Sequence, residues 1–158
     1  MAIFDEITAT AASAKFKTGT LRRDGDKCYV YVQLSASAQG AAANGAVLYG
    51  TLGDRNVVTD DISTTGVNLV RGIAVGAIAK GSYGWIQTWG SHSVVKTDGG
   101  DDITTGDTVI GDTTADGVCD SIAKGSAITY RPIGFAYDAD SDTADTVAVF
   151  VTLESGSN

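Results

Sequence analysis

The stretch from Arg71 to Gly90, RGIAVGAIAKGSYGWIQTWG, decides the fold. Residues 71–78 are small, apolar and partly β-branched, and they are too few for a buried helix, so they predict a buried strand. Residues 79–82 supply turn residues, and residues 83–89 place large side chains at alternate positions, which is typical of a second strand. We therefore predict a hairpin. One face of its second strand would carry Tyr83, Trp85, Gln87 and Trp89.

Length and composition point to one all-β domain. The chain has 158 residues, a mass of 16.1 kDa and 43% apolar residues, which is enough for a real core. Twenty glycines and one proline, together with frequent Thr, Val, Asp and Ser, favour many short strands joined by tight turns. We predict a compact β-sandwich or barrel.

The charge argues against nucleic-acid binding. A formal charge of −8 would repel a phosphate backbone, and the one basic cluster, in residues 15–23, is followed at once by Asp24 and Asp26. The longest apolar run, residues 72–79, is far below the roughly 20 residues that cross a bilayer, so we expect no membrane span. Acidic Asp5 and Glu6 stand where a secretory signal would be basic, and we expect synthesis in the cytoplasm.

The chain divides into an arm and a β-domain. Residues 1–20 lack a steady period of two or 3.6 and predict an arm that orders against something else, with an edge strand of the domain itself over Ile3 to Thr8 as the alternative. Residues 21–158 form the predicted β-domain, in which units 45–97 and 106–154 resemble each other. The alternative is that glycine-rich β-sequence aligns with itself by chance.

The internal match persists in order and spacing. Residues 45–50 align with residues 106–111 at an offset of 61, residues 71–75 with 131–135 at 60, and residues 83–89 with 147–153 at 64. Positions that alternate on these strands should face the core. The predicted core residues are Ile73, Val75, Ile133, Phe135, Val149 and Val151.

No motif predicts a catalytic residue, a metal site or a cofactor. His92 is the one histidine, which excludes a multi-histidine metal site, and we expect it at a partly exposed strand position. The acids from Asp138 to Asp142 open like a calcium loop but lack its later ligands, so a solvated hairpin tip is the favoured interpretation and a looser cation site the alternative. Cys28 and Cys119 are expected to be free thiols.

Large apolar side chains in the arm and the hairpin are candidates for a protein or subunit interface, because rigid aromatic residues contribute much of the area buried at interfaces. A position in the core, or a platform on which sugars stack, would use the same aromatic residues. The candidate interface residues are Ile3, Phe4, Ile7, Phe16, Tyr83, Trp85 and Trp89.

These elements together resemble the small all-β capsid cement, or head decoration, proteins of tailed bacteriophages. That family commonly shows a Gly-x-x-Val start, a Val/Ile-Gly-x-Ala strand and a Tyr-Gly-Trp-Val-Gln-like strand. The corresponding elements here are Gly45 to Leu48, Gly72 to Ala74, Tyr83 to Gln87, Gly106 to Val109 and Ile133 to Ala136. The resemblance covers residues 28 to 153 and leaves the arm unmatched.

The resemblance implies a structural virion protein and not an enzyme. Such a protein binds the outer surface of an assembled phage head, where it cements major capsid subunits against internal DNA pressure, and many members form trimers. The expected partners are the major capsid protein and other copies of the chain. Two alternatives stay open: a phage tail or fibre-associated β-protein, and a carbohydrate-binding module that uses the tryptophan pair.

Overall fold

A computed structural model describes residues 7–63, 69–100, 102–140 and 145–154, and in these ranges the chain is all-β, as predicted. No helix among these residues is long and apolar enough to cross a membrane. The strands are β1 (Leu21–Asp24), β2 (Lys27–Leu34), β3 (Val47–Gly50), β4 (Val57–Thr59), β5 (Val70–Ala74), β6 (Tyr83–Lys96), β7 (Thr108–Gly111), β8 (Cys119–Ile122), β9 (Pro132–Ala136) and β10 (Thr146–Thr152).

Five strands close into a first ring. Strand β2 pairs in parallel with β4, and the antiparallel pairs β4–β3, β3–β5, β5–β6 and β6–β2 lead back to it. Closure leaves none of these five strands without a partner on either side, and β1 adds to β2 outside the ring. The core of this small barrel is apolar and consists of Val30, Val32, Leu34, Ala38, Ala42, Ala46, Leu48, Val58, Ala74, Ile78 and Ile86.

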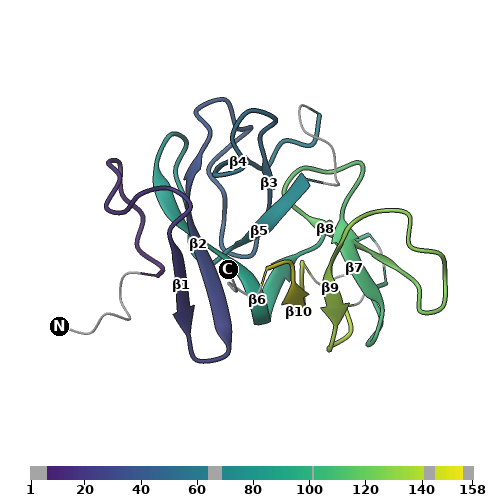
Figure 1. Cartoon of the computed structure of the whole chain (residues 1–158). Coiled ribbons are helices and arrows are strands. Elements are labelled where there is room, and N and C mark those ends of the chain that lie inside the picture. The colour runs from purple at the N-terminus through teal and green to yellow at the C-terminus, as the bar shows by residue number, and fades with distance from the viewer. Residues whose placement is uncertain (1–6, 64–68, 101, 141–144, 155–158) are drawn as a thin grey trace.

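A second ring repeats the same order. The distal half of β6 pairs with β10, and the antiparallel pairs β10–β9, β9–β7 and β7–β8 follow. Thr97, directly after β6, forms a parallel bridge with Cys119 of β8 and returns the ring to its start. The long strand β6 therefore belongs to both rings. In Figure 1, β1 and β2 lie at one end of the molecule and β7, β8 and β9 at the other.

Hydrogen bonds at the start of β3 and β7 match between the rings. The amide of Gly45 donates to the carbonyl oxygen of Ala74 at 2.8 Å, and the amide of Gly106 donates to that of Ala136 at 2.7 Å. Both glycines adopt a left-handed φ, of 83° and 93°, which side chains rarely tolerate. The two rings thus share a strand order and a turn geometry. A common origin of the two units stays a prediction.

The strand register corrects the sequence alignment of the units. In β3–β5, Leu48 pairs with Gly72, and in β7–β9 the corresponding pair is Val109 with Gly134. Gly72 therefore corresponds to Gly134, an offset of 62 and not 60. The sequence alignment matched Arg71 with Arg131 and Ile73 with Ile133 because their residue types are the same, and this placed it two residues out of register.

The outer face of the first ring is buried by the second. Val47, Tyr49, Val70 and Ile73 are at most 1% exposed and belong to one core cluster with the inner residues of the second ring. Phe135 occupies in the second ring the place that Ile73 holds in the first, yet it is 46% exposed. Its predicted burial is wrong, because no third ring among the described residues covers that face.

The predicted hairpin forms, but its limits differ. Strand β5 ends at Ala74, and residues 75–82 follow as a connection in which Ile78 bridges to Ala42. Val75 is half-buried, whereas it was predicted inside. The turn is present, since the amide of Ser82 donates to the carbonyl oxygen of Ala79 at 3.0 Å. Strand β6 continues to Lys96, well beyond the predicted end at residue 89.

Candidate interaction surfaces

The described part of the predicted arm, residues 7–20, lies against the first ring. Ala11 exchanges two backbone hydrogen bonds with Tyr83, at 3.1 and 2.9 Å, and the amide of Gly19 donates to the carbonyl oxygen of Tyr31 at 2.7 Å. Ile7 is 9% exposed and packs with Tyr29, Tyr31 and Trp85. Ile3 and Phe4, the other two candidates in the arm, lie outside the described residues.

Three more of the candidate residues meet in this cluster. The ring of Phe16 lies 5.3 Å from that of Tyr31 and 5.4 Å from that of Trp85, and Tyr83 stacks on Tyr31 at 6.1 Å. Trp85 is only 3% exposed. Within one copy of the chain, contacts of Phe16 with Tyr31 and Trp85 therefore hold the arm segment against strands β2 and β6. Tyr83 is half-buried and packs against the same cluster.

Trp89 lies apart from that cluster, in an aromatic row of the second ring. The register between β2 and β6 shifts beside Trp89, and Gly90 follows with a left-handed φ of 94°. The tryptophan ring contacts Phe150 edge-on at 5.8 Å, and Phe150 stacks on Phe135 at 5.4 Å and 15°. We call Trp89, Phe150 and Phe135 the aromatic row.

The strand partners of Phe150 and Phe135 are uncharged. Phe150 pairs with Ser91 on one side and with Phe135 on the other, and Phe135 pairs with Thr108. The corresponding line in the first ring, Tyr29, Gln87, Ile73 and Val47, is at most 7% exposed. The second ring thus leaves open a line of uncharged residues whose counterpart in the first ring is covered.

Sequence reasoning missed Phe135 and Phe150 as surface residues. A signal for Phe150 existed, because Val147, Val149 and Val151 alternate along the strand and an inward position for them turns Phe150 outward. Phe135 offered no such signal. The connection between β8 and β9, which protrudes at the right of Figure 1, exposes two further apolar side chains, Ile128 at 57% and Tyr130 at 37%.

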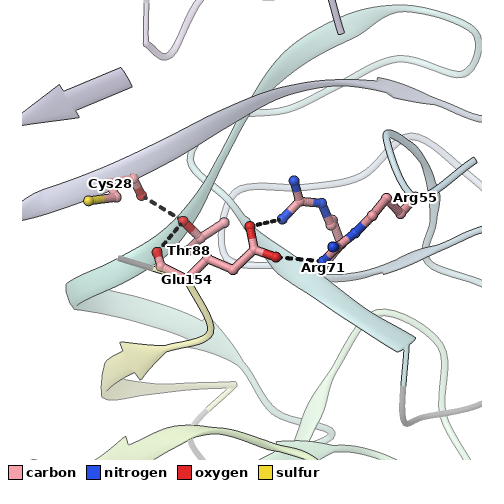
Figure 2. Close-up of polar contacts among 5 residues, drawn as sticks. All are labelled: Cys28, Arg55, Arg71, Thr88 and Glu154. Carbon is pink, nitrogen blue, oxygen red and sulfur yellow. Dashed lines mark hydrogen bonds and ion pairs between the residues drawn. The ribbon is translucent and has the colours of Figure 1, made fainter. Parts of the chain in front are cut away.

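A second candidate surface is built from arginines and a glutamate. Glu154 follows β10, and its carboxylate bridges Arg55 Nη2 at 2.5 Å and Arg71 Nη1 at 2.7 Å (Figure 2). The Thr88 hydroxyl donates to the backbone oxygen of Glu154 at 2.9 Å and fixes this end of the strand. Arg71 is 6% exposed, and its Nε has no hydrogen-bond partner within the described part of the chain.

Burial and ion pairing shift the pKa values of Arg71 and Glu154 in opposite directions. Burial lowers the pKa of Arg71, and its attraction to Glu154 offsets part of that effect. Burial alone would raise the pKa of Glu154, but its ion pairs and hydrogen bonds with Arg71 and Arg55 lower it overall. The glutamate is therefore ionised at neutral pH and holds the two guanidinium groups together.

A cleft of about 480 Å³ opens beside this ion-pair cluster. Arg55, Arg71 and Arg131 line it together with Leu52, which is 83% exposed, and Leu69, which is 37% exposed. No sequence motif predicts the cleft, because the residues that line it come from segments far apart in the chain. The one signal is Arg71 itself, a charged residue within an apolar strand.

His92 is buried and not partly exposed as predicted. It is 6% exposed, and its Nδ1 accepts a hydrogen bond from the amide of Val94 at 3.4 Å. Burial lowers the pKa of His92 to about 4, so the imidazole is neutral at physiological pH.

The other residues weighed for chemistry lie dispersed. Cys28 and Cys119 are buried thiols that form no disulfide, as expected. Among the described residues, no three His, Cys, Asp or Glu side chains are placed to hold a metal ion together. Of the predicted Asp138 to Asp142 tip, residues 141–144 lie outside the described ranges, and Asp140 is 6% exposed.

Comparison with known proteins adds no relative to this description. No family model, no curated protein and no solved structure matches the chain.

Proposed function

We propose that this chain is a structural protein that binds the outer surface of a tailed-phage head and cements its major capsid subunits against internal DNA pressure. The aromatic row is the observation that carries the proposal of a docking protein. Aromatic side chains that are exposed or half-buried and have uncharged strand partners are typical of the centre of protein interfaces. The specific partner, the capsid, rests on the resemblance of residues 28–153 to head decoration proteins.

The architecture supports a role in binding. In the first ring, Ile73 and Val47 of the corresponding line pack with residues of the second ring and are fully buried. A partner that covers Phe135 and Phe150 would gain comparable apolar burial, at roughly 25 cal/mol per Å² before the costs of association. Many such sites on a closed shell would add their binding free energies and stabilise the assembly. Trimerisation on the shell is part of the proposal.

The test is binding to preassembled heads that lack the protein. We expect the purified chain to add to the heads and to raise the temperature at which they rupture. Phe135→Ser should weaken this binding by about tenfold or more, the loss of roughly 1.4 kcal/mol or more. Leu21→Ser is the matched control, since Leu21 is 40% exposed on β1, away from the row, and it should bind like the parent chain.

Two results would contradict the proposal. Heads that rupture at the same temperature with and without saturating protein would exclude the cement role. Unchanged binding of the Phe135→Ser variant would exclude the aromatic row as the docking surface. Mass measurement of the protein bound to heads and free in solution tests the trimer.

A carbohydrate-binding module is the second candidate, and the same row favours it. Adjacent, half-exposed aromatic rings are the kind of surface on which sugar rings stack. Titration with soluble oligosaccharides while tryptophan fluorescence is monitored separates the two functions. Trp89 belongs to the row, whereas Trp85 is buried elsewhere, so a Trp89→Phe variant assigns any change to the row.

A further inference from the structure

We propose, as an extension that rests on the proposed function, that the partner surface that receives the aromatic row carries lysine or arginine side chains beside its apolar centre. The negative charge of the chain is concentrated in one half. Residues 91–158 contain 12 acidic and three basic side chains, a formal charge of −9, whereas residues 1–90 contain seven acidic and eight basic ones. The part of the chain that builds the second ring and carries most of the aromatic row is therefore strongly acidic.

The strand directions gather many of these acids at one rim of the second ring. The end of β6, the start of β10, the end of β9 and the start of β7 lie together, because each strand is antiparallel to the next. The amide of Thr97 donates to the carbonyl oxygen of Asp145 at 3.0 Å. The amide of Asp140 donates to that of Ile103 at 2.8 Å. We call this region the acidic rim. Its described acidic residues are Asp98, Asp102, Asp107, Asp138, Asp140 and Asp145.

The chain neutralises little of the charge at the acidic rim. The same segments, with the residues that follow β8, contribute two lysines, Lys96 and Lys124, against six acidic residues. Four of the six are exposed and form no ion pair in the described ranges, namely Asp98, Asp102, Asp138 and Asp145. Their charges are therefore available to a partner.

Asp140 gives a second, independent indication that the acidic rim lacks a positive partner. It is 6% exposed, and neither of its carboxyl oxygens has a hydrogen-bond partner within the described part of the chain. A carboxyl group buried in this way is costly unless a hydrogen-bond donor or a cation approaches it. The approach of a basic side chain to this rim would therefore be favourable.

The acidic rim adjoins the aromatic row on the outer wall of the second ring. Exposure alternates along the end of β9, where Phe135 and Tyr137 are 46% and 45% exposed and Ala136 between them is buried. Tyr137 therefore shares the face of Phe135, about 7 Å further along the strand. Asp138 follows directly and is exposed. A partner that covers Phe135 thus reaches the acidic rim across Tyr137.

This combination selects the chemistry of the partner. The centre of a protein interface is apolar and aromatic, and charged groups around it give specificity through pairing with opposite charges. An acidic rim beside an aromatic centre favours a surface with lysine or arginine next to apolar side chains. It disfavours an acidic surface, since like charges brought together repel.

Binding to preassembled heads at low and high salt tests the charge of the partner. The affinity of the parent chain should fall by about tenfold or more between about 50 and 500 mM NaCl, because salt screens charge pairs at an exposed rim. A variant that combines Asp98→Asn, Asp138→Asn and Asp145→Asn should bind about tenfold more weakly than the parent at low salt. At high salt the two should agree within about twofold.

A charge-matched variant makes the test specific. Asp24→Asn, Asp26→Asn and Asp54→Asn together remove the same three charges from the β1–β2 turn and the β3–β4 connection. This variant should keep the affinity of the parent within about twofold at both salt concentrations. Asparagine can still accept the backbone hydrogen bonds that Asp98 and Asp138 receive from Gly100 and Ala139. The ¹H–¹⁵N NMR spectrum of each variant reports whether its fold is retained.

Three outcomes would overturn the inference: head binding of the parent that does not weaken with salt, a rim variant that binds like the parent at low salt, or equal weakening in both triple variants. In each case the chain still binds heads, so the cement role stands. A parent chain that binds no heads would overturn the proposed function and this extension together. The two failures are therefore distinguishable.

Discussion

Gly72 and Gly134 hold the same place in the two rings, and each leaves no room for a Cβ atom. A Cβ on Gly72 would lie 2.8 Å from the backbone oxygen of Gln87, and one on Gly134 would overlap the backbone oxygen of Phe150. Gln87 pairs with Ile73 and Phe150 with Phe135, the residues that follow the two glycines. The close approach of neighbouring strands at this point is thus a property that both rings share.

Substitution of either glycine by alanine should destabilise the fold. Because the obstructing atoms belong to the backbone, Gly72→Ala and Gly134→Ala should each cost roughly 2 kcal/mol or more in the free energy of unfolding. Gly40→Ala is the control, since nothing lies within 4 Å of a Cβ there, and it should change stability by roughly 0.5 kcal/mol at most. Urea unfolding measures all three. Equal stability of Gly134→Ala and Gly40→Ala would contradict the described strand approach.

Ile73 and Phe135 should differ sharply although they occupy corresponding positions. Ile73 is fully buried between the rings, so Ile73→Ala should cost roughly 2–5 kcal/mol. Phe135 is 46% exposed, and Phe135→Ala should cost roughly 1 kcal/mol or less. Chemical unfolding of the two variants checks the difference. Similar costs would mean that something covers Phe135 in the free protein.

This asymmetry marks the limit of what the sequence predicts. Alternation and turn residues were enough for the all-β class, for the turn at residues 79–82 and for burial of Ile73, Ile133, Val149 and Val151. They could not predict the exposure of Phe135. The alternation of residues along a strand can show that a side chain points away from its own ring, but it does not show whether a second ring covers that side chain.

The length of β6 and the arginine cleft could not be predicted from the sequence either, because both depend on contacts between distant segments. Strand β6 changes partners from β2 to β10 near Gly90, and this change interrupts the alternation that indicates a strand. The cleft depends on Glu154 reaching Arg71 from 83 residues away. Contacts of that separation are set by the closure of the second ring and leave no local trace in the sequence.

Glu154 should matter far more to stability than its partner Arg55. Glu154→Gln removes both ion pairs and leaves the guanidinium of Arg71 buried without a counter-charge, which should cost roughly 3 kcal/mol. Arg55→Gln removes only the pair whose arginine is 59% exposed, and it should cost roughly 0.5 kcal/mol. Thermal and urea unfolding at neutral pH measure both. Equal effects would show that Arg71 finds another acceptor.

His92 should make the fold sensitive to mild acid. Because burial lowers the pKa of His92 to about 4, below the value of about 6.5 expected for the unfolded chain, the unfolded state binds the proton first as the pH falls. The histidine makes no difference above about pH 6.5, and between pH 7 and pH 5 it should reduce the free energy of unfolding by about 2 kcal/mol. Asp107 and Glu154, whose pKa values are lowered in the folded chain, add their own loss only at lower pH, where unfolded carboxyl groups take up protons.

His92→Gln tests this sensitivity directly, since the chain contains no other histidine. Glutamine retains a hydrogen-bonding side chain but does not ionise, so the variant should lose the dependence of stability on pH between pH 7 and pH 5. Its stability at pH 7 serves as the internal reference, because any general damage from the substitution appears there as well. Urea unfolding across this pH range measures the slope. A slope equal to that of the parent chain would mean that His92 takes up its proton in the folded state as readily as in the unfolded state, and that its burial does not control the response to acid.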